Sequence, residues 1–217
     1  MRYGSAFAKI ALAVVSLALV ACGGMPPLAI PKGAPVILSI DVQRVSFNAT
    51  DRRGRVFNYS DIGSFVLTEA VEAQASTQGL TAEARVQQQA LSSLFEQEVR
   101  IRFERQGGKT ASSAGPAVVV VRIDNLVVGY HNVGFFGVDP VAAVRVHSTS
   151  DPSNVKPNPS SRTIETRVRD AAFSIPSLNS FVGDREKGYA GLRKAVVDLA
   201  ERVSTSISKA QNGDSER

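Results

Sequence analysis

AVVVVRIDNLVVGY, residues 117–130, is the stretch of sequence that decides the fold. β-Branched residues fill positions 118–121 without interruption, a composition typical of a central strand. Two further strands are predicted downstream, at residues 141–148 and 163–175, because apolar and polar residues alternate in both. Short loops join these three strands, so we expect them to pair in antiparallel fashion.

The segment upstream predicts another strand, at residues 36–42. The apolar positions that share one face of it at a period of two are Val36, Leu38, Ile40 and Val42. Residues 51–54 have the composition of a turn, and residues 56–59 predict a short return strand.

Residues 64–105 are rich in Ala, Gln and Glu, which predicts helix. Gly79 is expected to interrupt the helix, and Thr81 to cap its longer second part. The apolar stripe that this part should bury consists of Val86, Ala90, Leu91, Leu94, Phe95 and Val99. Gly107 and Gly108 are expected to end it.

The last predicted helix has the clearest pattern, with Asp184 as its N-cap. Its apolar stripe recurs at spacings of three or four and consists of Tyr189, Leu192, Val196, Leu199, Val203 and Ile207. Gly188 and Gly191 would permit close approach of a neighbouring element. Residues 209–217 are predicted to be a disordered tail.

The order strand-helix-strand-strand-strand-helix predicts an α+β fold of two layers. We expect a mostly antiparallel sheet of about four strands with two helices on one face. A single domain should span residues 36–208. Residues 48–80 are more than this plan needs, which suggests an insertion.

The N-terminus has the layout of a secretory signal at residues 1–21, with cations, a short apolar run and small residues. The apolar run is too short to cross a bilayer, which needs about 20 residues. Its end, Leu19-Val20-Ala21-Cys22, resembles the bacterial lipobox at all four positions. This resemblance implies cleavage before Cys22 and acylation of Cys22, which would hold the protein to a membrane. The alternative is an ordinary signal with an incidental Cys.

Residues 22–35 are rich in Pro and Gly, which predicts a semi-extended tether from the lipid to the domain. Because Gly23 rather than Asp follows the cysteine, analogy with bacterial sorting favours the outer membrane, on its periplasmic side.

The order of elements together with the anchor resembles small outer-membrane lipoproteins over residues 36–207. These include the lipopolysaccharide-assembly lipoprotein and the auxiliary lipoproteins of ABC-type lipid transporters. The resemblance implies a non-enzymatic auxiliary or scaffold subunit of an envelope transport or assembly complex, with an envelope protein as partner.

The composition excludes several classes of function. The net charge of +5 on 217 residues is mild, and the Arg residues are scattered, so no nucleic-acid partner is expected. The single Cys is the proposed anchor, so the domain should fold without a disulfide. Gly107-Gly108-Lys109-Thr110 lacks the other features of a phosphate-binding loop.

Phe135 and Phe136, flanked by Gly134 and Gly137, are the best candidates for contact with a partner or membrane. They lie where a hairpin tip is predicted, and loops normally avoid large apolar groups. The alternative is that both rings fold back over the sheet edge.

The remaining candidates are charged or titratable. Arg145, Arg167 and Arg169 could meet an anionic head group. His131 and His147 should lie about 20 Å apart along the sheet, which is too far to share a metal ion. We interpret the acids near predicted strand ends as turn or capping residues; these are Asp124, Asp139 and Asp170. No catalytic residue, metal or cofactor is therefore expected.

Two other functions remain open. The domain could bind a lipid or glycolipid, with acyl chains between helices and sheet. Less favoured is a hydrolase that acts on the cell wall through paired carboxylates.

Overall fold

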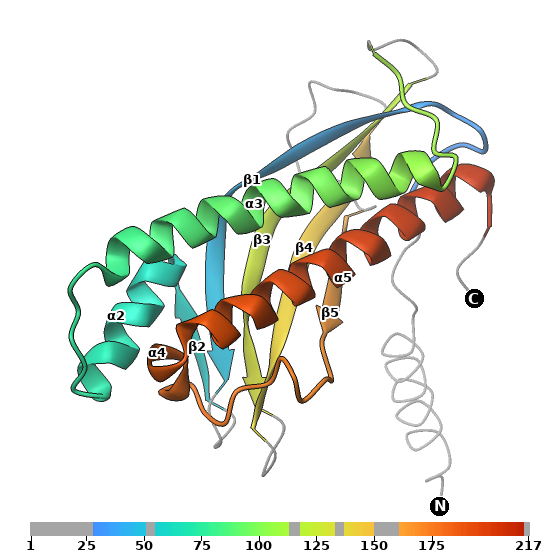
Figure 1. The fold of residues 1–217 in the computed structure, drawn as a ribbon. Helices are drawn as coiled ribbons and strands as arrows, with labels where there is room; N and C mark the ends of the chain where they lie inside the picture. The colour runs from blue at the N-terminus through green and yellow to red at the C-terminus, as the bar shows by residue number, and fades with distance from the viewer. Residues whose placement is uncertain (1–27, 51–54, 113–117, 133–136, 150–160, 215–217) are drawn as a thin grey trace, which may run out of the picture.

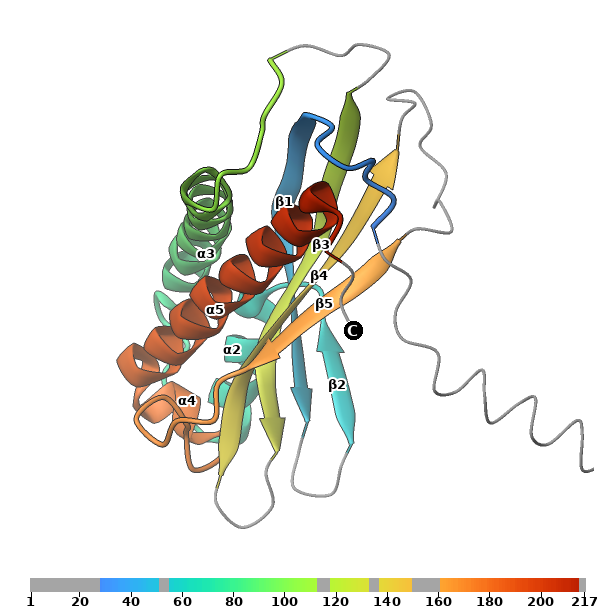
Figure 2. The same cartoon turned by 90° about the vertical axis from the view of Figure 1, so that its right-hand side faces the viewer.

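The computed structural model describes residues 28–50, 55–112, 118–132, 137–149 and 161–214. In this part of the chain a five-stranded sheet carries all the helices on one face (Figures 1 and 2). The strands are β1 (Val36–Thr50), β2 (Val56–Tyr59), β3 (Val119–Asn132), β4 (Val138–Thr149) and β5 (Arg162–Arg167). The helices are α2 (Ile62–Glu72), α3 (Leu80–Arg105), α4 (Ser180–Gly183) and α5 (Arg185–Asn212).

The predicted α+β two-layer fold is confirmed. The sheet order is β2-β1-β3-β4-β5, in which β1 and β3 pair in parallel and the other neighbours are antiparallel. The three later strands are antiparallel neighbours, as predicted. Among the described residues, the short return strand predicted at 56–59 is confirmed as β2 and makes five strands rather than about four. Helix α2 lies largely within the stretch predicted as helix before Gly79, whereas α4 was not predicted.

Two strands end at places that the alternation did not predict. β1 continues past residue 42 to Thr50, because a register shift between Asp41 and Val45 changes the phase of its alternation. The strand predicted over 163–175 ends at Arg167. Asp170 then forms a turn in which its carbonyl accepts from the amides of Phe173 and Ser174. This turn interrupts the ladder, and pairing with β4 resumes only in an isolated bridge between Ile175 and Val138.

The apolar stripe predicted for α3 is confirmed in part. Leu91, Phe95 and Val99 are buried and Leu94 is partly buried against the core, but the prediction is wrong for Val86 and Ala90. The buried residues of α3 are Leu80, Ala84, Leu91, Phe95, Val99 and Phe103. Val86 is 62% exposed and Ala90 is also exposed, because both lie off the line that these residues define. Thr81 lies within the helix, and Gly79 precedes it as the N-cap with φ of 76°, a left-handed conformation that suits Gly.

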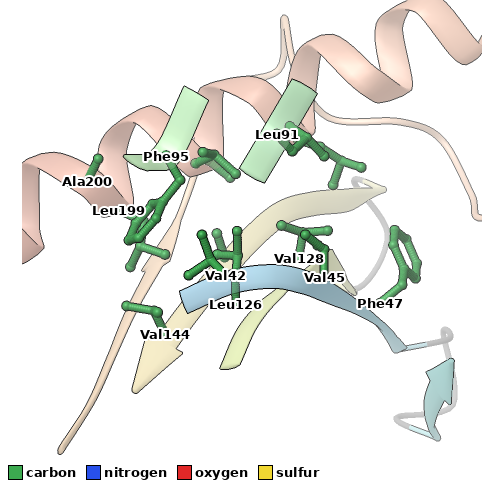
Figure 3. Close-up of a cluster of buried hydrophobic side chains, with 14 of the residues drawn as sticks. Val42, Val45, Phe47, Leu91, Phe95, Leu126, Val128, Val144, Leu199 and Ala200 are labelled. Carbon is green, nitrogen blue, oxygen red and sulfur yellow. The ribbon is translucent and has the colours of Figure 1, made fainter. Parts of the chain in front are cut away.

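The core lies between the sheet and the two long helices (Figure 3). Side chains from β1, β3 and β4 meet side chains from α3 and α5; those labelled in Figure 3 are Val42, Val45, Phe47, Leu91, Phe95, Leu126, Val128, Val144, Leu199 and Ala200. Among the described residues, no helix combines the length and the apolar character that crossing a bilayer requires.

The supposed insertion at residues 48–80 is part of the core. Its helix α2 places Phe65 against Phe47 of β1, with ring centroids 3.9 Å apart. Phe65 also meets Phe181 of α4 edge-on at 5.2 Å. The segment therefore closes one end of the core rather than lying outside it.

Candidate functional site

The domain has two ends with different chemistry. We call the end at which α3 and α5 finish the Gln211 end, and the end at which they begin the hairpin end (Figure 1). β1 and β3 begin at the Gln211 end, and the connection between β3 and β4 lies at the hairpin end (Figure 2).

The first chain segment that the structure describes is docked on the Gln211 end. Leu28 and Ile30 are buried in the core, with 4% and 8% of their surface exposed. The amide of Gly33 donates to the carbonyl of Gln211 at 2.6 Å. The prediction of a tether over residues 22–35 is therefore wrong for 28–35, because two apolar side chains among the prolines bury themselves on the domain.

Gln211 holds this docked segment to the rest of the domain. Its side-chain amide donates to the carbonyls of Ala34 and Lys109 at 2.7 and 2.9 Å, and its Oε1 accepts from the amide of Lys109 at 2.9 Å. Gln211 is 2% exposed. The disordered tail predicted from residue 209 is wrong for 209–212, which continue α5. Gln211 follows Ile207 by four residues on the buried stripe, a signal that sequence analysis missed.

Replacing Gln211 with Ala should lower the free energy of unfolding by about 2 kcal/mol, because partly buried backbone groups of Ala34 and Lys109 lose their three hydrogen bonds to the Gln211 side chain. Hydrogen exchange at residues 28–35 should accelerate in the same variant. Gln106→Ala, which removes one exposed hydrogen bond to Thr205, is the matched control and should change little. Equal effects of the two substitutions would contradict the assigned role of Gln211.

A polar pocket of about 470 Å³ opens at the hairpin end, between the first turns of α3 and α5. Its lining residues are Glu83, Gln87, Gly183, Asp184, Arg185, Glu186, Tyr189 and Arg193. The guanidinium of Arg185 donates to Glu83 at 3.0 Å, and that of Arg193 donates to Gln87 at 3.2 Å. Both signs of charge therefore line this pocket.

Tyr189 is the buried member of the pocket lining. It is 2% exposed, and its hydroxyl has no hydrogen-bond partner among the described residues. Burial raises the pKa of this phenol, and the nearby Glu83 carboxylate adds to the rise, whereas Arg185 opposes it. The Tyr189 ring packs edge-on against Phe181 at 5.1 Å, so packing rather than polar contact fixes its position.

Close packing connects the pocket to the base of the β3–β4 hairpin. The hydroxyl of Tyr130 donates to the carbonyl of Gly188 at 2.6 Å. A Cβ at Gly188 would lie 2.5 Å from the Phe181 ring, and one at Gly191 would lie 2.9 Å from the Tyr130 hydroxyl. The prediction that these two glycines permit close approach is confirmed.

Two of the predicted site features lie outside the described residues. These are Cys22 and the pair Phe135 and Phe136. The strands on either side of that pair are antiparallel partners up to Asn132 and Val138. The contact of the pair with a partner stays a prediction.

The three candidate head-group arginines do not form one cluster. Arg145 lies opposite Thr163 and Arg167 lies opposite Val141, so along the sheet they are four residues, or about 13 Å, apart. Arg145 pairs with Asp124 at 2.9 Å, and Arg167 pairs with Asp139 at 3.0 Å. Arg169 follows β5 and is exposed. Their contact with an anionic head group stays a prediction.

Two of the three acids interpreted as turn residues have another role. Asp170 does form a turn, since its side chain accepts from the amide of Ala172 at 2.9 Å. Asp124 and Asp139 instead lie within strands and form the ion pairs with Arg145 and Arg167, because cross-strand register places them opposite or diagonal to these cations.

The two histidines are far apart, as predicted. His131 is opposite Asp139 and His147 is opposite Arg122, which places them about 26 Å apart along β4. His147 lies 3.9 Å from Asp124, yet its pKa is lowered, mainly by burial. Within the described ranges, no group of three or more potential metal ligands is found.

These features define a two-layer α+β domain with a docked N-terminal segment at one end and a polar pocket at the other. No protein-family model and no curated protein matches the chain. Among solved structures, it is similar to a minor lipoprotein from Acinetobacter baumannii (14% identity, TM-score 0.39, covering 55% of this chain and 87% of that chain). It is also similar to protein XCC0632 from Xanthomonas campestris, of family model DUF330 (14% identity, TM-score 0.35, covering 88% and 98%). Both are weak likenesses at the level of fold.

Proposed function

We propose that this chain is a lipid-anchored envelope lipoprotein whose domain serves as a non-enzymatic auxiliary or scaffold subunit of an envelope transport or assembly complex. The observation that carries the proposal is the sequence at residues 19–22, which resembles a lipobox and is followed within six residues by a segment docked on the domain. A lipid on Cys22 would thus be held close to a folded body rather than at the end of a long tether.

The two ends of the domain support a division of roles. The chain enters the domain from Cys22 at the Gln211 end. The pocket lies at the opposite end, as do the end of β3 and the start of β4, between which Phe135 and Phe136 fall in the sequence. A partner that meets the hairpin end would leave the lipid free to stay in the membrane. We further propose that this membrane is the outer one, with the domain in the periplasm, because Gly23 follows the cysteine.

Binding of acyl chains between helices and sheet has less support. That layer is occupied by side chains packed on one another, including the stacked rings of Phe47 and Phe65. The pocket described above lies at the helix ends and is lined mainly by polar and charged groups. Its chemistry suits a polar group of a partner better than a hydrocarbon chain.

The test has two arms, both on protein from the native host. In the first, intact mass and lipid analysis should find acyl chains on Cys22; an unmodified thiol would overturn the anchoring. In the second, a photo-crosslinking residue at position 193 beside the pocket should give a stoichiometric adduct with one envelope protein.

Replacing Phe135 and Phe136 together with Ala should reduce this adduct several-fold, because two large apolar groups leave the proposed contact. The matched control is Val71→Ala with Val86→Ala, which removes two exposed apolar side chains, 67% and 62% exposed, from α2 and α3. We expect the control to retain the adduct. Equal loss in both double variants, or no adduct in the wild type, would contradict the proposed partner surface.

A further inference from the structure

We propose that the Gln211 end of the domain lies directly on an anionic membrane surface, with the side chains of Lys32, Lys109 and Lys209 against lipid head groups. The inference rests on the proposed acylation of Cys22. It adds to that proposal by specifying which end of the domain faces the membrane and which charge of lipid head group this end prefers.

The first argument is reach. Leu28, which is buried on the domain, follows the acylated position by six residues along the chain. A fully extended chain spans at most about 3.5 Å per residue, so the lipid can be no more than about 21 Å from Leu28 along the chain. If residues 28–35 were not docked, the fourteen residues 22–35 would all act as a linker, and the domain could lie much farther from the membrane.

The second argument is the grouping of the three lysines around the residue that holds the docked segment. Lys32 belongs to that segment, and its side chain would lie 3.2 Å from a Cβ placed on Gly213. Lys109 exchanges backbone hydrogen bonds with the Gln211 side chain. Lys209 precedes Gln211 by two residues. All three lysines are exposed, although they come from widely separated parts of the sequence.

The third argument is charge. The exposed acids close in sequence to these lysines are Glu104 and Asp214, and an exposed cation, Arg105, also ends α3 here. Cations outnumber acids among these named residues. The partial negative charge at the C-terminal end of α5 does not make this surface negative, because the effect of the helix dipole falls off within one turn. Clustered lysines held near a bilayer attract anionic lipid within a Debye length of the surface.

Helix α5 offers two labelling positions at a known separation for the test. Asn212 and Glu186 are exposed residues in its last and first turns. They are 26 positions apart, which at 1.5 Å per residue is about 39 Å. The chain holds a single Cys, so in the acylated protein a cysteine introduced at either position can be labelled selectively.

The experiment uses acylated full-length mature protein carrying a donor dye at Asn212→Cys or Glu186→Cys, bound to phosphatidylcholine vesicles with or without phosphatidylglycerol. An acceptor dye is placed on the lipid head groups. We expect several-fold higher energy transfer from position 212 than from position 186, and a larger difference on the phosphatidylglycerol vesicles. Equal transfer from both positions would overturn the inference while leaving the anchored function intact. Failure of the protein to bind vesicles at all would instead overturn the anchoring on which the inference rests.

Charge reversal distinguishes the contact between the lysines and the head groups from the closeness that the short chain between Cys22 and Leu28 imposes by itself. Lys32→Glu with Lys109→Glu and Lys209→Glu should abolish the extra difference seen on phosphatidylglycerol vesicles. The matched control reverses three cations nearer the hairpin end, Arg55, Arg85 and Lys187, and should retain this difference. If the lysine variant behaves like wild type, or if the control loses the difference equally, the head-group contact is overturned. Circular dichroism of each variant establishes that it is folded before the comparison is made.

Discussion

Replacing Glu69 with Gln should stabilise the folded protein by about 3 kcal/mol at pH 8 and should have almost no effect at pH 4. Glu69 lies on α2 and is 4% exposed, and its Oε2 has no hydrogen-bond partner among the described residues. Burial of this carboxyl raises its pKa to about 7, and the charge of Glu72 adds to the rise. Its charge in turn helps to raise the pKa of Tyr59, behind the effect of burial.

The sign of this effect follows from which state binds the proton more tightly. Because the folded-state pKa of about 7 exceeds the ordinary value of 4.5, the folded protein holds a proton on Glu69 that the unfolded chain releases earlier. Stability is therefore fully present below about pH 4.5 and falls as the pH rises towards 7. Gln resembles the protonated acid and carries no charge, so it removes this loss.

The measurement is urea unfolding of both proteins at several pH values between 4 and 8. The wild type should lose stability across this range, and Glu69→Gln should lose less. Glu72→Gln is the control, since Glu72 is exposed on the same helix and contributes only the secondary charge effect. A Glu69→Gln protein with the pH dependence of the wild type would show that Glu69 is not protonated in the fold.

Local patterns predicted most of the fold. The continuous β-branched run within residues 117–130, the alternation at 141–148 and the capped stripe of α5 each extend over several residues. Because the pattern extends over several residues, the buried face of each element can be predicted without knowing which elements pack against it. In α3 the stripe was predicted correctly at Leu91, Phe95 and Val99 but wrongly at Val86 and Ala90, because these two residues are apolar yet exposed.

The two ends of the domain were less predictable. Gln211 joins chain segments that are 177 and 102 positions away in the sequence. Its spacing from Ile207 is a local signal for burial, but this spacing says nothing of the distant segments that Gln211 contacts. The pocket likewise depends on Arg185 meeting Glu83, 102 positions apart. Tyr189 was predicted as a buried residue, but its unpartnered hydroxyl depends on three-dimensional surroundings that the sequence does not display.

Replacing Gly129 with Ala should destabilise the protein by about 4 kcal/mol or more, the largest effect of a single substitution that we expect. Gly129 lies in β3, where it pairs in parallel with Asn48 of β1 and is opposite Val141 of β4. A Cβ at this position would lie 1.7 Å from the carbonyl oxygen of Asn48. This oxygen belongs to the backbone of the neighbouring strand, so no side-chain rotation can relieve the overlap. The two central strands would have to separate locally, with loss of ladder hydrogen bonds and of core packing behind them.

Gly183→Ala is the matched control, because a Cβ there would meet nothing within 4 Å and its φ is not in the left-handed region. We expect its free energy of unfolding to stay within about 1 kcal/mol of the wild type, since Ala favours helix over Gly. Urea unfolding at one pH, followed by far-UV circular dichroism, compares the two variants directly. The close approach of β1 to β3 at Gly129 would be refuted by an Ala variant as stable as the control. If Gly129→Ala yields no folded protein while Gly183→Ala does, the expected order of effects holds, because only the first substitution forces two backbones apart.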